Sequence, residues 1–194
     1  MVAYASANGG IDRGWKYILT VVDYFSRKVW LRALKSQTAI NVRSALINIV
    51  AETNTYPRII QADNGSEFQK ETSEWMKDNN VTYIKKLSYS PESNGLVEGR
   101  NKLVRKILRE INIRTNSRNW TNYLQTTANL LNSQRNGTTK QTPDSIWKEG
   151  HELQGEQDQS IIRLHERRII NAIKNNDTTE YKIGDFVRVK MGTL

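Results

Sequence analysis

Cysteine is absent from this 194-residue chain, and histidine occurs only twice, at His151 and His165. Disulfide bonds are therefore impossible, and a structural zinc site is excluded because such sites need four cysteine or histidine ligands. No apolar stretch approaches the roughly 20 residues that a transmembrane helix requires. Residues 1–7 lack the basic start and the long apolar segment of a signal peptide. These absences predict an intracellular protein without membrane-spanning segments.

Positive charge is in clear excess. The 29 lysine and arginine residues outnumber the 20 acidic ones, so the formal net charge is +9 and the isoelectric point is about 9.7. Such a balance predicts an anionic partner and favours nucleic acid over a membrane surface. The hydrophobic fraction of 37% is low but sufficient for a modest core. At this length we expect one domain of ordinary size with a small appendage.

The order of apolar and turn-forming residues predicts an α/β fold with a mixed sheet. Strand-forming residues on both sides of a turn at Asp23 predict a hairpin over residues 15–34. The expected elements that follow are a helix over 38–52, a strand over 58–62, a short helix over 70–79, a strand over 81–86, a helix from about 94 to 113, an amphipathic helix around 120–131 and a short helix that begins near 142. Thr38 and Ser93 are the expected N-caps of the first and third of these helices.

The character of the sequence changes after residue 150. Residues 1–150 are predicted to form the main domain, and residues 151–180 a polar linker followed by a basic helix. Residues 181–194 contain a turn and an alternating strand pattern, which indicates the first strand of a small barrel that remains incomplete. The fold expected is therefore an α/β domain with a basic C-terminal extension.

Two acidic residues stand in turn-rich motifs on different elements. Asp63 follows an apolar strand, and Glu98 lies in the first turn of a long basic helix, where the helix macrodipole favours its charge. Two carboxylates on rigid elements that converge can bind Mg²⁺ against a phosphate, because Mg²⁺ takes one or two carboxylates together with phosphate oxygens. The alternative is that both are solvated surface groups, since Asp-Asn-Gly alone is a common turn.

The two segments resemble the second and third acidic motifs of the retroviral-type integrase catalytic core. This family comprises the Asp-Asp-Glu recombinases of retroviruses, long-terminal-repeat retrotransposons and large self-synthesising DNA transposons. The matching residues are Asp63, Asn64, Gly65 and Phe68 in the second motif and Pro91, Ser93, Gly95, Glu98 and Asn101 in the third. Glu98 follows Asp63 by 35 positions, which is the family's spacing to within a residue. The similarity extends over roughly residues 14–148, and residues 184–189 resemble the start of the family's C-terminal SH3-like barrel.

The resemblance implies an RNase H-like fold, Mg²⁺ or Mn²⁺ as cofactor, metal binding and catalysis by Asp63 and Glu98, and DNA strand transfer. The family uses three carboxylates. The segment that carries the first one corresponds to residues before Met1, so the chain is expected to be truncated relative to the family. Asp23 is expected to initiate a turn rather than to bind metal. Asp12, in a glycine-rich loop, is a weaker substitute.

The helix that carries Glu98 also carries a row of bases. Lys102, Arg105 and Arg109 follow Glu98 at offsets of four, seven and eleven residues, which places all of them on its face of the helix. These bases, together with Asn101 of the matched motif, are the predicted DNA-binding residues. Contacts of this kind hold phosphates and position DNA without reading its sequence. A solvated charged face is the alternative.

Three hypotheses about function remain open from the sequence. The leading one is a DNA integrase or transposase core that performs metal-dependent 3′ end processing and strand transfer. It would act on element ends and target DNA as a homo-oligomer, with a nuclear location expected in a eukaryotic host. The second is a catalytically dead, DNA-binding remnant of a mobile-element integrase, which the missing third acid favours. A ribonuclease H is the third, and the family's third motif argues against it.

Overall fold

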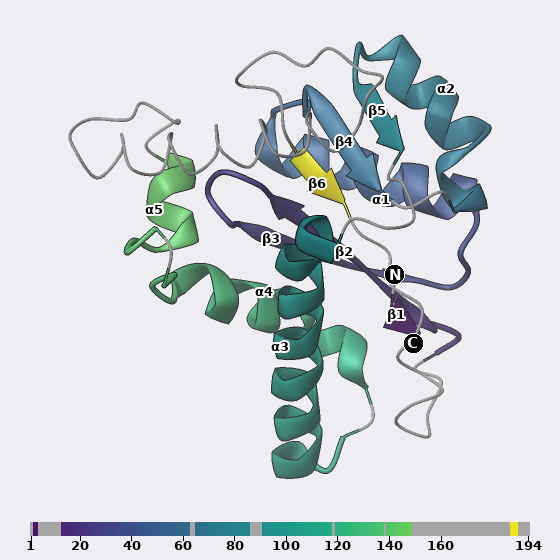
Figure 1. The fold of residues 1–194 in the computed structure, drawn as a ribbon. Helices are drawn as coiled ribbons and strands as arrows, with labels where there is room; N and C mark the ends of the chain where they lie inside the picture. The colour runs from purple at the N-terminus through teal and green to yellow at the C-terminus, as the bar shows by residue number, and fades with distance from the viewer. Residues whose placement is uncertain are drawn as a thin grey trace.

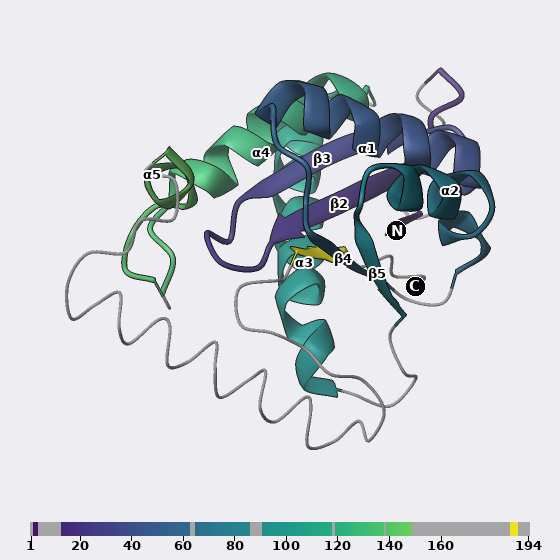
Figure 2. The same ribbon diagram turned by 90° about the horizontal axis from the view of Figure 1, so that it is seen from above.

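A mixed sheet covered by helices on both faces is the framework of the protein (Figures 1 and 2). The computed structural model describes residues 2–3, 13–62, 65–85, 91–117, 119–137, 139–148 and 187–189. The strands are β1 (Val2–Ala3), β2 (Tyr17–Asp23), β3 (Val29–Leu34), β4 (Ile59–Ala62), β5 (Thr82–Lys85) and β6 (Val187–Val189). The helices are α1 (Ala39–Thr53), α2 (Glu71–Asp78), α3 (Pro91–Thr115), α4 (Leu124–Ser133) and α5 (Pro143–Lys148), with 3₁₀ turns at Ser66–Phe68 and Trp120–Tyr123.

The sheet combines antiparallel and parallel pairing. The hairpin strands β2 and β3 are antiparallel, with Val22 opposite Val29 and Tyr17 opposite Leu34. Strands β4 and β5 are parallel and are joined by α2. Strand β6 lies between the two pairs, antiparallel to β2 and parallel to β4. The predicted α/β architecture with a mixed sheet is therefore confirmed.

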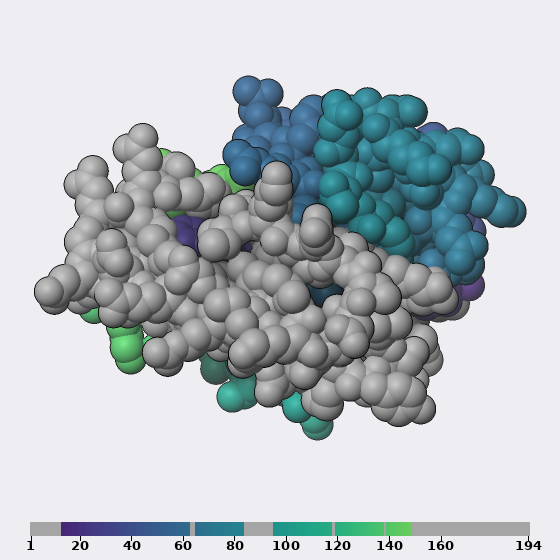
Figure 3. Space-filling view, turned by 45° about the horizontal axis from the view of Figure 1, so that its top comes forward, coloured from purple at the N-terminus to yellow at the C-terminus, as the bar shows by residue number. Residues whose placement is uncertain are grey.

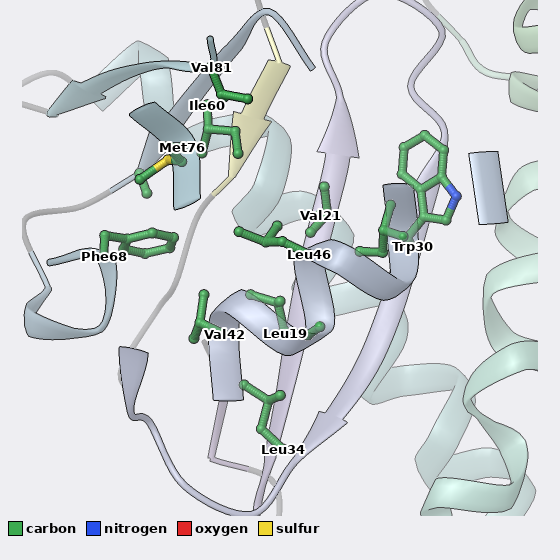
Figure 4. Packing of buried hydrophobic residues seen from close by; sticks show 13 residues of the cluster. Leu19, Val21, Trp30, Leu34, Val42, Leu46, Ile60, Phe68, Met76 and Val81 are labelled. Atoms are coloured by element: carbon green, nitrogen blue, oxygen red, sulfur yellow. The ribbon is translucent and has the colours of Figure 1, made fainter. Parts of the chain in front are cut away.

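Alternation along the central strands builds two cores, one on each face of the sheet. In β2, Leu19 and Val21 face α1 and α2, whereas Ile18 and Val22 face α3 and α4. Figure 4 shows the first core, with Leu46 of α1 beside β2. Because both faces are covered, the strand is a continuous apolar run rather than an alternation of apolar and polar residues. In the space-filling view, α2 and β5 (teal) form one corner of the molecule (Figure 3).

Helix ends follow local chemistry, with one correction to the sequence prediction. Thr38 occupies the N-cap of α1 with extended backbone, although its side chain makes no capping hydrogen bond. Asn54 ends α1 in the left-handed conformation, at φ 50°. The prediction that Ser93 caps the long helix is wrong, because α3 begins at Pro91 and Ser93 lies inside it. Proline suits a first helical turn, since its φ is already helical and its missing N–H is not needed there.

Two buried polar side chains fasten helices to their neighbours. Asn132 of α4 accepts a hydrogen bond from the Val29 N–H (2.8 Å) and donates one to the Val29 carbonyl (2.9 Å). It thus pairs with the outer edge of β3 as a further strand would. Thr72 of α2 directs its hydroxyl at the Ala39 carbonyl (2.8 Å) and the Glu67 carbonyl (2.9 Å). These contacts hold α4 against β3 and α2 against the start of α1.

The remaining sequence predictions are confirmed for the elements up to residue 148. Thr142 caps α5 through a bond from the Ser145 N–H (3.1 Å), as expected for a helix that begins near 142. The predicted helix around 120–131 is divided into a 3₁₀ turn and α4. Residues 149–186 lie outside the described residues, so the linker and the basic helix remain predictions. In the described part of the chain, no helix is long and apolar enough to cross a membrane.

Candidate DNA and metal site

Asp63 directly follows the last residue of β4, which is the position that its motif predicts. The preceding Ala62 is buried and pairs with β5. Asp63 and Asn64 themselves lie outside the described residues, so the distance between Asp63 and Glu98 remains a prediction. Phe68, from the same motif, is fully buried and stacks on Tyr83 with ring centres 5.9 Å apart. The motif's aromatic residue therefore serves the core rather than the site.

Glu98 is exposed on α3, while its neighbours on the opposite side of the helix anchor it. Val97, Val104 and Leu108 are buried against β2, β3 and α4. This packing orients α3 so that Glu98 points into solvent. A carboxylate on a helix fixed in this way loses little conformational freedom on binding a ligand.

Asn101 is buried, at 4% exposure, although it was predicted to contact DNA. Its side-chain oxygen has no hydrogen-bond partner. Burying such an acceptor unpaired costs free energy, so the position is informative. Burial argues for a ligand-facing or packing role for Asn101 rather than an open contact with phosphate.

The predicted basic face of α3 is present, with one residue to add and one of lower exposure. Lys102 and Arg109 are exposed, as predicted. Arg105 is half-buried, and its Nε donates a 3.3 Å hydrogen bond to the Asn101 carbonyl. Lys106 is exposed on the same side, four residues after Lys102, and the sequence prediction omitted it. We refer to Lys102, Lys106 and Arg109 as the base row.

Two other residues of α3 differ from their predicted roles. Leu103 was expected to pack on the sheet, but it is 43% exposed beside the base row. Arg100, counted among the free bases, is partly buried, and desolvation lowers the pKa of its guanidinium. It lies 3.5 Å from the Arg27 carbonyl, at the turn between β2 and β3. Arg100 therefore faces the turn of the hairpin rather than the open side of α3.

Asp23 has the structural role that the sequence predicts. Its carboxylate accepts hydrogen bonds from the Ser26 N–H (2.7 Å) and the Ser26 hydroxyl (2.6 Å). Asp23 is 5% exposed, and the Arg27 N–H donates to its backbone carbonyl, which closes the turn. These bonds hold one carboxylate oxygen within the hairpin turn. Among the described residues, no group of three or more acidic or histidine side chains could hold a metal ion.

Comparison with known proteins identifies the family. Residues 2–91 match the family model described as "Integrase core domain". The chain is related to the retroviral-type integrase core. It is 28% identical over 139 residues, 70% of its length, to the Pro-Pol polyprotein of feline foamy virus. Those residues span only 12% of that polyprotein.

Solved integrases share the fold. The HTLV-2 integrase catalytic core domain in complex with magnesium (trimeric form) matches 68% of this chain and 85% of its own, with a TM-score of 0.58 and 24% identity. Integrase in a simian T-cell lymphotropic virus intasome matches 71% of this chain and 49% of its own, with a TM-score of 0.61 and 22% identity. At these identities, the likeness to integrase structures establishes the architecture and not the chemistry.

Proposed function

We propose that this chain is the DNA-processing core of an integrase, a metal-dependent polynucleotidyl transferase that trims 3′ ends of element DNA and joins them to target DNA. The observation that carries the proposal is the exposed side of α3, which presents Glu98 together with the base row. A carboxylate that can bind a cation, beside bases that can bind phosphates, suits a phosphodiester substrate. The relation to the integrase core domain favours DNA among polyanions.

Asp63 and Glu98 are the residues that would hold Mg²⁺ or Mn²⁺. The donors fit such an ion, because Mg²⁺ prefers carboxylate and amide oxygens. The unpartnered side-chain oxygen of Asn101, one helical turn after Glu98, adds a third oxygen donor to this end of α3. A bound ion of this kind supplies positive charge at the reacting phosphate and lowers the pKa of an attacking hydroxyl.

The chain's own residues bind and position the substrate. The base row would hold consecutive phosphates along α3, which aligns the DNA with Glu98. Arg100 anchors the same helix on the β2–β3 turn, so the bound strand meets a fixed surface. We further propose that the active form is a homo-oligomer acting on element ends and target DNA, in the nucleus of a eukaryotic host.

Replacing Glu98 by glutamine tests the proposal, because Glu98→Gln keeps the side-chain shape and removes the charge. We expect Mg²⁺ to tighten DNA binding by the parent chain and to have no such effect on Glu98→Gln. Metal-dependent nicking of a supercoiled plasmid, where the parent shows it, should also disappear. The matched control is Glu110→Gln, which neutralises another exposed glutamate of α3. Equal responses to Mg²⁺ in both variants would remove Glu98 from the mechanism.

A second candidate function is DNA binding without cleavage. The exposed base row supports it directly, since phosphate contacts need no carboxylate. The two candidates differ in their response to metal. A DNA-binding remnant would bind DNA equally well with Mg²⁺ and with EDTA, and it would leave the plasmid supercoiled under both conditions.

A further inference from the structure

One edge of β2 is occupied by two short strands that are distant in the sequence. Strand β1 pairs with β2 at Ile18 and Tyr17, and β6 pairs with it at Asp23, Val22 and Val21. Since β3 pairs along the whole of β2 on one edge, β1 and β6 both lie on the other edge. Both are antiparallel to β2, so they run in the same direction, one after the other. We call this position in the sheet the lane.

The lane has room for one longer strand. Strand β2 spans seven residues, and β6 and β1 together pair with five of them. The two residues between the paired stretches are Leu19 and Thr20. Thr20 is almost completely buried, and its hydroxyl has no hydrogen-bond partner. The register is therefore that of a single strand interrupted in its middle.

Strand β6 also connects the two halves of the sheet. It pairs with β2 on one side and with β4 on the other, where Val187 lies opposite Ile60 and Arg188 opposite Gln61. In the described part of the chain, no other strand pairs with both β2 and β4. The half that precedes Asp63 and the half that supports α3 are thus joined through three residues from the far end of the chain.

We propose that the lane is a docking site for an extended segment, and that Val187–Val189 of the same chain is its separable occupant. Added strands gain affinity from backbone hydrogen bonds to both neighbours, whatever their side chains. A lane covered on both faces favours β-branched residues such as the two valines of β6. Three residues are fewer than in a typical strand, so β6 can leave at a lower cost than the rest of the sheet.

The absence of cysteine permits a direct test in the full chain. Asp23 donates its N–H to the Lys28 carbonyl (2.8 Å), so by alternation Val21 directs its backbone groups toward β3. Val21 and Val189 are then a non-hydrogen-bonded pair, with Cα atoms roughly 4.5 Å apart, which a disulfide can bridge. We expect the double variant Val21→Cys/Val189→Cys to form an intrachain disulfide on mild oxidation, seen as a faster monomer on a non-reducing gel.

A matched pair controls for random encounters. In Tyr17→Cys/Val189→Cys the first cysteine lies on the same face of β2 but about 13 Å further along, which exceeds disulfide reach. We expect no cross-link there. A disulfide between two chains in the Val21→Cys/Val189→Cys protein would overturn the proposal in favour of a second copy as occupant. Absence of any disulfide, or equal yields in both variants, would overturn docking itself.

Hydrogen exchange tests whether β6 is separable. Arg188→Pro removes the N–H opposite Val22 and should release the strand. We expect the Val22 amide, which faces β6, to exchange at least tenfold faster than in the parent. The Ile18 amide, which faces β1, should stay protected. Arg188→Ala keeps the N–H and should leave both amides unchanged. Loss of protection at Ile18 in the proline variant would show that β6 is inseparable from the sheet.

Discussion

Removal of the base row should flatten the dependence of DNA binding on salt. The perturbation is the triple variant Lys102→Gln/Lys106→Gln/Arg109→Gln, in which exposed charges are lost and the helix-forming tendency of α3 is kept. Glutamine is chosen over alanine so that the length of each side chain, and with it the cover over α3, changes little.

The magnitude follows from the number of phosphate contacts. Each base that neutralises a phosphate contributes about 0.9 to the slope of log K against log salt for duplex DNA, so three exposed bases account for about 2.7. Between 50 and 200 mM salt, the parent should therefore lose roughly 40-fold more affinity than the triple variant does. Arg105, half-buried and bonded to a carbonyl, should contribute less than any member of the row when changed alone.

The assay is fluorescence anisotropy of a labelled duplex, titrated at four or more salt concentrations without metal. A control with the same net charge is needed, because the chain carries a formal charge of +9. Lys35, Lys70 and Lys77 are exposed elsewhere, and their triple glutamine variant also removes three positive charges. If both triple variants change the slope equally, the effect is one of overall charge, and α3 is not the DNA-binding surface.

Three further predictions concern stability, measured by urea denaturation with tryptophan fluorescence. Asn132→Ala should lower the free energy of unfolding by about 2–4 kcal/mol, because it leaves the buried N–H and carbonyl of Val29 unpaired. Asn129→Ala, at an exposed site on the same helix, should change it by less than about 0.5 kcal/mol, and similar losses in both would contradict this reasoning. Thr72→Val should cost about 1–2 kcal/mol while Thr72→Ser, which keeps the hydroxyl, costs clearly less; the reverse order would show that only the methyl group matters. Ser26→Ala removes a hydrogen bond to a buried carboxylate and should cost about 1.5–3 kcal/mol, so an unchanged midpoint would refute a structural role for that bond.

The main elements of the fold were accessible from the sequence because their signals are local. Strand-forming runs on either side of the turn at Asp23 predicted the hairpin, and proline after Thr142 predicted the start of α5. The error at Ser93 has the same origin. Serine is a good N-cap, but proline two residues earlier is compatible with a helix that has already begun, and sequence alone does not rank the two signals.

The candidate site was predictable in type and less so in detail. Periodicity placed Lys102 and Arg109 on the face of Glu98, and both are exposed. Periodicity could not show that α3 extends beyond the surface it covers, which leaves Leu103 exposed. Nor could it show that Arg100 turns toward the hairpin, because that contact depends on a segment 73 positions away.

The position of β6 was not predictable for a related reason. An alternating pattern predicts a strand, and residues 181–190 show that pattern, but it does not specify the sheet to which the strand is added. The structure places Val187–Val189 in the main sheet. The separate C-terminal barrel remains a prediction, since the residues on either side of β6 lie outside the described part of the chain.

Strand β6 also has a consequence for biosynthesis. A ribosome releases the chain from its N-terminal end, so β2 and β4 emerge long before Val187–Val189 exist. Until translation is nearly complete, both strands must wait with an unpaired edge, and edges of that kind invite pairing with other chains. Closure of the sheet then depends on a contact between opposite ends of the sequence, which is a slow step. A chaperone that shields nascent strands should therefore raise the yield of soluble protein more than a lower growth temperature alone.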